Sequence, residues 1–564
     1  MKKIKIRAAA PGGGRQSRAA CSARALVLGA AGLLVWPLAV RAEEAASTGS
    51  AVEVNWNTSV KYSAGYRLKE PDARLISGGS SASADDGDRN FAKGLVSKRF
   101  DIFSEMDLHW GPAGVRASGA AWYDAAYNRR NDNNSPGTSQ GTGAAGNEFQ
   151  PDTARLHGKK AELLDAFAFY AGDVGGHDFS IRLGRHALVW GESLFFGNNG
   201  IANAMVPVDV IKASSVPGSQ FRELILPVSQ VSGQFNLTPT VTLGAYYQFR
   251  WEKTRLPGVG SYLSSSDMLD VGGRQLEIIP PFKTPGFSYP GFYANRSADD
   301  RPDNGGQGGV QLRFSVPEWG TDFGFYAVRY HERVPQLVLL TRGGTGLAPP
   351  SAPVAPSTYR LYYGSGARAY GVSFSKGVGE AALAGEVSLR DGATLVSDPV
   401  QAFAGLSPAH GRSLHMNLSV LTAFEPNVLT AESTAAAEIA CNRTLSVTNN
   451  QPLAANAQRS ACALRVVYEP KYRQVVPGLD LALPLSVSTT RGKSSAVRSF
   501  GADRAGDISL TANLNYLDRW RASLGYTYYY GPIGTPLDDR GQHFSFRQAL
   551  ADRNFLSLSL ATTF

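Results

Sequence analysis

The sequence predicts an all-β protein that forms a transmembrane antiparallel β-barrel of about eighteen strands. Segments of roughly ten residues alternate between apolar and polar side chains, and a tilted strand of that length crosses a bilayer. The connections between these segments alternate between short turns and long polar loops, which is typical of an outer-membrane barrel. The last ten residues, FLSLSLATTF, form one more alternating strand that ends on an aromatic residue. Strand boundaries inferred from a sequence slip by several residues, so sixteen strands are an alternative.

The N-terminal residues 1–42 have the features of a secretory signal peptide. They contain eight basic residues, no acidic residue, an apolar run at 25–40 and small residues at the cleavage spacing. A membrane anchor is disfavoured because the run is short for a span and Pro37 interrupts it. Removal of this segment lowers the basic residues from 56 to 48, against 47 acidic residues, so net charge does not support nucleic-acid binding. We expect the exported chain to span 43–564.

The expected strands follow the alternating pattern along the whole chain. In the first, Val54, Trp56 and Val60 share one face, and Asn55 and Asn57 share the other. The expected strands lie near 51–66, 99–110, 114–127, 160–171, 177–187, 226–237, 240–251, 308–316, 321–332, 369–376, 381–390, 413–424, 428–439, 462–471, 479–488, 506–516, 521–530 and 554–564. Long connections rich in Gly, Ser, Pro and Asp are expected at 67–98, 128–159, 188–225, 252–307, 333–368, 391–412, 440–461, 489–505 and 531–553. An even number of strands places both termini on the periplasmic side.

The final strand is expected to carry a barrel-assembly signal. Leu556, Leu558, Leu560 and Phe564 form its apolar face, and we expect the barrel-assembly machinery to read them. Lipid requires every backbone polar group to be paired, so this strand should close onto the first one and contact outer-membrane lipid.

Aromatic residues near the strand ends are expected to form two interfacial belts. Trp110, Trp319 and Trp520 lie near short turns, whereas Trp122 and Trp251 lie near long loops.

Motifs that would suggest an enzyme lack the context that their chemistry needs. A G-x-S-x-G match at 137–141 and a G-x-G-x-x-G match at 141–146 share one Gly/Ser-rich loop, with no strand before them and no helix after them. No nucleophile–base set falls on adjacent strands. We therefore expect no catalytic residue, no enzyme activity and no cofactor.

The cysteines and the acidic clusters fit an exported protein. Cys441 and Cys462 have a spacing that predicts a loop disulfide in an oxidising compartment. The acids in 85–88 and at 299–300 could hold Ca²⁺ weakly at the surface, but solvated loop acids are the favoured interpretation, so no metal site is expected.

The connection at 188–225 is too apolar for an ordinary external loop. It either folds into the barrel mouth as a plug or constriction, or forms a small core that stiffens the external loops. The first is favoured. The residues in or beside it that could line the lumen, contact a solute or anchor the loop through salt bridges are Arg182, His186, Glu192, Phe195, Phe196, Asp209, Arg222 and Glu223.

The sequence also resembles a large Gram-negative outer-membrane family that is filed as a domain of unknown function. The resemblance rests on GDRNFAKGLVSKRFDIFSEMDLHW (87–110), GRHALVWGESLFFGNNGIANAMVPVDV (184–210), PGSQFRELILP (217–227), TRLPGVGSYLSSSDMLDVGG (254–273) and GEVSLR (385–390). It implies an outer-membrane protein whose gene tends to neighbour those of a periplasmic lipid-carrier-like protein and an RND-type permease, and these two are its expected partners. This chain departs from the pattern in a longer Ala/Pro-rich loop at 344–356 and in the cysteine hairpin.

These observations lead us to expect an outer-membrane channel for hydrophobic or aromatic compounds that are steroid-, terpene- or lipid-like. A structural or adhesive barrel whose loops bind surfaces is one alternative. The outer component of an export route for lipid-like cargo is another.

Overall fold

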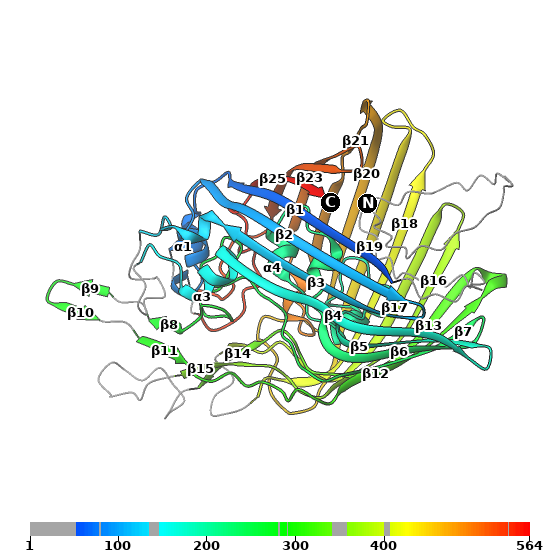
Figure 1. Cartoon of the computed structure of the whole chain (residues 1–564). Coiled ribbons are helices and arrows are strands. Elements are labelled where there is room, and N and C mark those ends of the chain that lie inside the picture. Colours follow the sequence, from blue (N-terminus) through cyan, green and yellow to red (C-terminus); the bar gives the residue numbers. More distant parts are fainter. Residues whose placement is uncertain are drawn as a thin grey trace.

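A computed structural model describes residues 52–77, 81–134, 146–279, 282–289, 292–340, 358–399, 407–539 and 541–564. These residues form a closed antiparallel barrel of eighteen strands (Figure 1). Its strand segments are β1 (Glu53–Arg67), β2 (Gly94–Trp110), β3 (Ala113–Asp124), β4 (Lys159–Val174), β5 (His177–His186), β6 (Val228–Thr238), β7 (Val241–Gln248), β12 (Gln307–Val316), β13 (Thr321–Tyr330), β16 (Ala367–Val378), β17 (Ala381–Thr394), β18 (His410–Phe424), β19 (Glu432–Val447), β20 (Ser460–Val476), β21 (Leu479–Ala482), β22 (Leu485–Arg491), β23 (Gly506–Tyr516), β24 (Trp520–Tyr530) and β25 (Phe555–Thr563). The predicted signal peptide and the 344–356 loop lie outside the described residues.

Two of these segments form a single barrel strand. β21 and β22 both pair with β20 on one side and β23 on the other, and Leu483 and Pro484 separate them. Proline has no N–H to donate to the ladder, which explains the interruption. The prediction of eighteen strands is therefore confirmed.

The first and last strands close the barrel. Tyr62 of β1 lies opposite Leu560 of β25, and Tyr66 lies opposite Leu556. On its other side β1 pairs with β2. The side chains of Leu558 and Phe564 are exposed on the outer surface. The prediction that the last strand closes onto the first strand is therefore confirmed.

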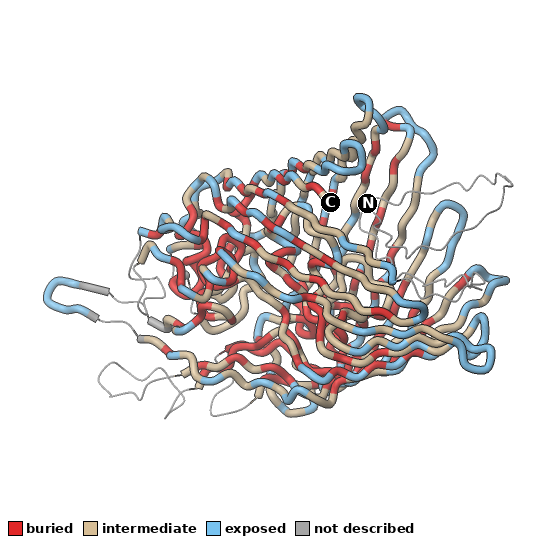
Figure 2. The backbone as a smooth tube through the Cα atoms, in the orientation of Figure 1, coloured by how far each residue is buried: buried red, intermediate tan, exposed pale blue. Residues whose placement is uncertain are grey.

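The strands separate an apolar outer face from a polar inner face. On β1, Trp56 is 65% exposed, whereas Lys61 and Ser63 are 6% and 1% exposed. The last strand repeats the pattern, since Leu558 is 47% exposed and Ser559 is 4% exposed. Figure 2 shows the resulting alternation along the wall and the buried residues gathered inside and toward the loop-bearing end. The chain is thus an outer-membrane barrel that crosses the bilayer many times.

Short turns and long connections lie at opposite ends of the barrel (Figure 1). Trp110, Trp319 and Trp520 are 41%, 63% and 42% exposed near the short turns, as an interfacial belt requires. The second predicted belt is wrong for Trp122 and Trp251, which are 6% and 9% exposed. The alternation places Trp122 on the inner face of β3, and Trp251 packs beneath the external connections.

Two of the external connections contain strands that the sequence did not predict. β8 (Gln275–Ile279), β11 (Phe292–Arg296), β14 (Gln336–Leu340) and β15 (Thr358–Tyr362) form a four-stranded sheet, and β9 (Phe282–Thr284) pairs with β10 (Phe287–Tyr289). Segments of three to five residues are too short to show a period.

The α-helices are short and lie in the long connections. They are α1 (Ala73–Ile76), α2 (Asp86–Arg89), α3 (Pro151–Thr153), α4 (Val210–Ser215) and α5 (Phe221–Leu224). Single helical turns lie in the same connections at Ser81–Ser83, Ala125–Asn128, Ala154–Gly158, Ile201–Ala204 and Arg498–Phe500, and Pro317–Trp319 forms part of the short turn between β12 and β13. Within the described part of the chain, no helix has the length and apolar character needed to span a membrane.

The predicted disulfide joins Cys441 and Cys462. Its expected position in a loop is wrong, because the two residues lie directly opposite each other on β19 and β20. Both strands extend beyond the predicted boundaries, so the connection between them is shorter than expected.

Candidate functional site

The connection between β5 and β6 crosses the interior of the barrel. Residues 188–225, called the crossing loop below, leave β5 after His186 and return to the neighbouring strand β6 at Val228. The first half contacts the inner face of β17, β18 and β19. The second half contacts β1 and β2, on another part of the wall. The loop is therefore held on both sides of the lumen.

A carboxylate on β19 holds the tip of the crossing loop. Glu438 is 1% exposed and faces inward. Its Oε2 accepts hydrogen bonds from the backbone N–H groups of Leu194, Phe195 and Phe196, at 3.2 Å and 3.0 Å for the first and last. Its Oε1 accepts a bond of 2.7 Å from the Asn417 side chain. Bonds to an ionised acceptor are stronger than neutral ones, so this carboxylate is a strong anchor.

A second carboxylate, Glu386 on β17, holds both ends of the same segment. It accepts the N–H of Glu192 at 2.6 Å and the N–H of Ile201 at 2.9 Å. A Cβ added at Gly191 or Gly200 would lie 2.3 Å from a Glu386 carboxylate oxygen. Gly191 also has φ +98°, which side-chain-bearing residues rarely adopt. The two glycines allow the backbone to approach this carboxylate.

Complementary donors bind the carbonyl groups of the loop. Arg390 donates to the backbone oxygens of Asn198, Asn199 and Gly200 at 3.1, 2.9 and 2.9 Å. The Asn199 side chain is fully buried, and its amide donates to the side chain of Asn417 and the backbone oxygen of Cys441. The backbone polar groups of this segment thus bond to inward-facing side chains of the wall, which satisfies them inside the barrel.

Apolar side chains fill the space between the loop and the wall. Trp190, Ile201 and Met205 form a buried cluster with inward-facing aromatic residues such as Tyr246 and Tyr326. The Trp190 ring lies 5.0 Å from the Tyr246 ring in an edge-on arrangement. Near the tip, Phe196 packs against a smaller cluster that includes Phe500, at 6.3 Å between ring centroids.

Ion pairs hold the second half of the loop. Asp209 caps the N-terminus of α4 by accepting the N–H of Lys212 at 3.0 Å, and it accepts a bond of 2.6 Å from Arg255. Arg222 pairs with Glu105 of β2. These pairs connect the loop to the wall and to the β7–β12 connection.

A cavity lies between α4 and the wall near the external mouth. It is lined by Ile211, Ser215 and Val216 of the loop and by Gly65, Val96, Ser97, Arg99, Asp124, Tyr127, His157, Tyr262, Leu263 and Phe555. The cavity has a volume of about 30 Å³, which is room for a water-sized group, and apolar and aromatic side chains alternate with polar ones in its lining.

The histidine in this lining is neutral. Burial, with Arg99 and Arg255 nearby, lowers the pKa of His157 to about 3. Its Nε2 accepts the N–H of Gly258 at 3.0 Å, and its ring stacks on Tyr127 at 4.8 Å. The ring therefore adds no charge to the cavity at neutral pH.

The family assignment rests on residues 23–564, which match the family described as "Protein of unknown function (DUF1302)". The chain belongs to this family. By sequence, it matches none of the curated proteins.

Three solved structures that are similar to this DUF1302 protein each share 10% sequence identity with it. The Acinetobacter baumannii OccAB4 structure has a TM-score of 0.42, and the comparison covers 91% of this chain and 98% of that one. The outer-membrane channel DcaP of Acinetobacter baumannii has a TM-score of 0.36, with 91% and 97% covered. Pseudomonas aeruginosa OpdK with vanillate has a TM-score of 0.40, with 91% and 98% covered.

The structure brings six of the eight candidate residues into the crossing loop and leaves two on the wall. The Arg182 guanidinium lies 5.9 Å from the Phe167 ring on β4. His186 bonds through Nε2 to Ser232 of β6 at 2.7 Å. Both therefore contact neighbouring strands.

The six loop residues divide between the two halves of the loop. Glu192, Phe195 and Phe196 lie at the tip, where their backbone N–H groups bond to the wall carboxylates and their side chains are partly exposed. Asp209, Arg222 and Glu223 are anchors: the first two form the pairs described above, and Glu223 accepts the N–H of Gln220 at 3.1 Å.

Glu438 and Asn199 belong to the site but were not among the residues predicted for it. Both have a signal in the sequence. Glu438 is an acid on a strand otherwise rich in alanine, and Asn199 lies between an apolar segment and a glycine. What the sequence does not show is that the two meet at the same part of the wall.

Proposed function

We propose that this DUF1302 protein is an outer-membrane channel for hydrophobic or aromatic small molecules, with the crossing loop as its constriction. One observation carries the proposal: a loop with an apolar tip is fixed across a polar lumen by wall carboxylates. A loop that only stiffened the external surface would not need buried anchors on β17 and β19.

The apolar tip of the crossing loop supports the solute class. Phe195 and Phe196 are partly exposed there, so a hydrophobic or aromatic molecule that passes the constriction would contact them.

The proposal includes delivery and partners. Export depends on the segment 1–42, and a periplasmic lipid-carrier-like protein and an RND-type permease would handle the solute beyond the barrel. A structural or adhesive barrel, or an export component, would instead leave uptake unchanged when the gene is removed.

The test is solute uptake by cells with and without the gene, using sterols, terpenoids, aromatic acids and long-chain acids. We expect loss of uptake for one hydrophobic class, restored by the intact gene. Deletion of 195–211 should change that uptake while the barrel still assembles. Unchanged uptake after this deletion would refute the constriction.

A point variant tests the cavity. Ser215 lines it, whereas Ser214 on the same helix is exposed and is absent from the lining. The Trp side chain is larger than the cavity, so Ser215→Trp should displace α4 and change uptake of the transported class several-fold, and Ser214→Trp should not. Equal uptake by the two variants would contradict a role for the packing of α4 against the wall.

A further inference from the structure

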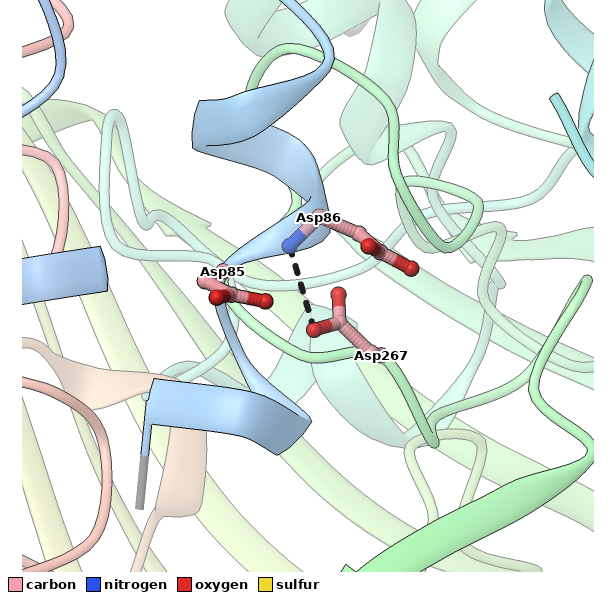
Figure 3. A group of neighbouring side chains, drawn as sticks. All are labelled: Asp85, Asp86 and Asp267. Carbon is pink, nitrogen blue, oxygen red and sulfur yellow. Dashed lines mark hydrogen bonds between the residues drawn. The ribbon is translucent and has the colours of Figure 1, made fainter. Parts of the chain in front are cut away.

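Three carboxylates are buried together where the β1–β2 connection meets the β7–β12 connection. Asp85, Asp86 and Asp267 are 0%, 4% and 0% exposed. One ligand oxygen from each lies within 4.8 Å of the others (Figure 3). The expectation that the acids at 85–88 are solvated is therefore wrong. The connections fold over them at the external mouth.

Two of these carboxylates have an oxygen without a partner among the described residues. Asp267 accepts the N–H of Asp86 through Oδ2 at 3.2 Å, but its buried Oδ1 has no hydrogen-bond partner. Figure 3 shows this free oxygen pointing into the space between the three side chains. Asp85 accepts from Arg89 at 2.5 Å through Oδ2, and its Oδ1 is also buried and unpartnered. A buried carboxylate oxygen without a partner is costly, so each of these atoms indicates a missing ligand.

The neighbouring buried acids show how the chain neutralises such charge elsewhere. Asp88 pairs with Arg67 at 3.0 Å and with Arg553 at 2.8 Å, and Asp552 pairs with Arg67 at 2.9 Å. This adjacent cluster contains two cations for two acids. In the three-carboxylate cluster, Asp85 pairs with Arg89, whereas the Asp267 carboxylate has no paired cation among the described residues, so its negative charge remains to be balanced.

We propose that Asp85, Asp86 and Asp267 bind a divalent cation, with the chemistry of Ca²⁺. Carboxylate oxygens are its preferred ligands at about 2.3–2.6 Å, so ligands on opposite sides of the ion are about 5 Å apart. The three ligand oxygens lie within 4.8 Å of one another, which is compatible with this spacing. The ion joins two external connections that are far apart in the sequence. Extracellular Ca²⁺ sites bind with dissociation constants of about 10⁻⁴–10⁻³ M, which is sufficient for a site at the external mouth.

The experiment uses the full-length barrel purified in detergent and stripped with a chelator. Calorimetric titration with CaCl₂ measures binding, and limited proteolysis with and without CaCl₂ measures protection of the external connections. We expect one Ca²⁺ per chain, slower cleavage with Ca²⁺, and at least tenfold weaker binding by Asp267→Asn. Asp303→Asn is the matched control, since Asp303 is an exposed acid in the same β7–β12 connection.

Heat-dependent gel mobility monitors barrel assembly independently, so a loss of Ca²⁺ binding can be distinguished from a failure of the variant to fold. No Ca²⁺ binding by the assembled wild-type protein at 5 mM CaCl₂ (about five times the weakest constant above) would overturn the proposal. Equal binding by wild type and Asp267→Asn would also overturn it. If Asp267→Asn fails to assemble, Asp85→Asn provides the same comparison. The test does not depend on whether the barrel transports a solute.

Discussion

Replacement of Glu438 with glutamine should release the tip of the crossing loop without unfolding the barrel. The substitution preserves the size of the side chain, but it removes the charge and leaves one acceptor oxygen where two now act. With that oxygen at the Oε2 position, the new NH₂ group would face the Asn417 amide, which is also a donor. The three backbone bonds from Leu194, Phe195 and Phe196 would remain as weaker, neutral bonds.

The size of the effect follows from these four bonds. A hydrogen bond to a charged group contributes about 1.5–3 kcal/mol, and a neutral one about 0.5–1.5 kcal/mol. A loss of about 1 kcal/mol at each backbone bond, together with the lost Asn417 bond, amounts to about 4 kcal/mol. Since about 1.4 kcal/mol corresponds to a tenfold change, the tip should detach roughly 10³ times more often.

Hydrogen exchange and single-channel current measure this detachment. Exchange of the amides at 194–196 should become about two to three orders of magnitude faster, and the conductance of the variant in planar bilayers should rise. Glu469→Gln is the control, because Glu469 is 3% exposed on the adjacent strand β20 but bonds to Lys471. Unchanged exchange and conductance in a correctly folded Glu438→Gln barrel would refute the anchoring role.

Three further predictions concern the other contacts of the site. Gly200→Ala should increase conductance, because the added Cβ would lie 2.3 Å from the Glu386 carboxylate and push the loop away; wild-type conductance in planar bilayers would contradict the close approach. The pKa of His157 is lowered to about 3, so the stability that its neutral ring contributes is present above about pH 6.5 and is lost as the pH falls. At pH 4.5 this loss approaches about 3 kcal/mol. The protection factors of the amides at 125–128 and 154–158, which are corrected for slower intrinsic exchange at low pH, should fall on acidification in wild type but not in His157→Phe. Cys441 and Cys462 are 21 residues apart, so reduction of their disulfide should lower the free energy of unfolding by up to about 3 kcal/mol, as measured with denaturant. The same reducing agent should not change the free energy of unfolding of a Cys441→Ala/Cys462→Ala double variant.

The wall of the barrel could be predicted because its rule is local. A strand with lipid on one side and a lumen on the other must alternate, and the sequence from Val54 to Tyr62 shows that alternation directly. The strand ends were harder to predict. β2 begins at Gly94 and β19 continues to Val447, so both strands extend beyond the ends that the sequence predicted. Lipid no longer imposes the alternating pattern on these extensions.

The site was only partly predictable because its contacts join distant parts of the chain. The apolar residues at 188–225 indicated that this connection is unusual, and its approach to the lumen was favoured on that basis. The residues that hold it, Glu386 and Glu438, lie 185 or more positions away from the amides that they accept. The same holds for the buried acids, because Asp86 and Asp267 are 181 residues apart. Only the closure of the barrel brings such groups together.

Transport by purified protein in liposomes tests the central claim most directly. Vesicles containing the wild-type barrel should take up the hydrophobic or aromatic solute faster than vesicles without protein, and deletion of 195–211 should change that rate. Uptake at the protein-free rate by both the wild-type and the deletion barrels would contradict the account of a channel with an internal constriction.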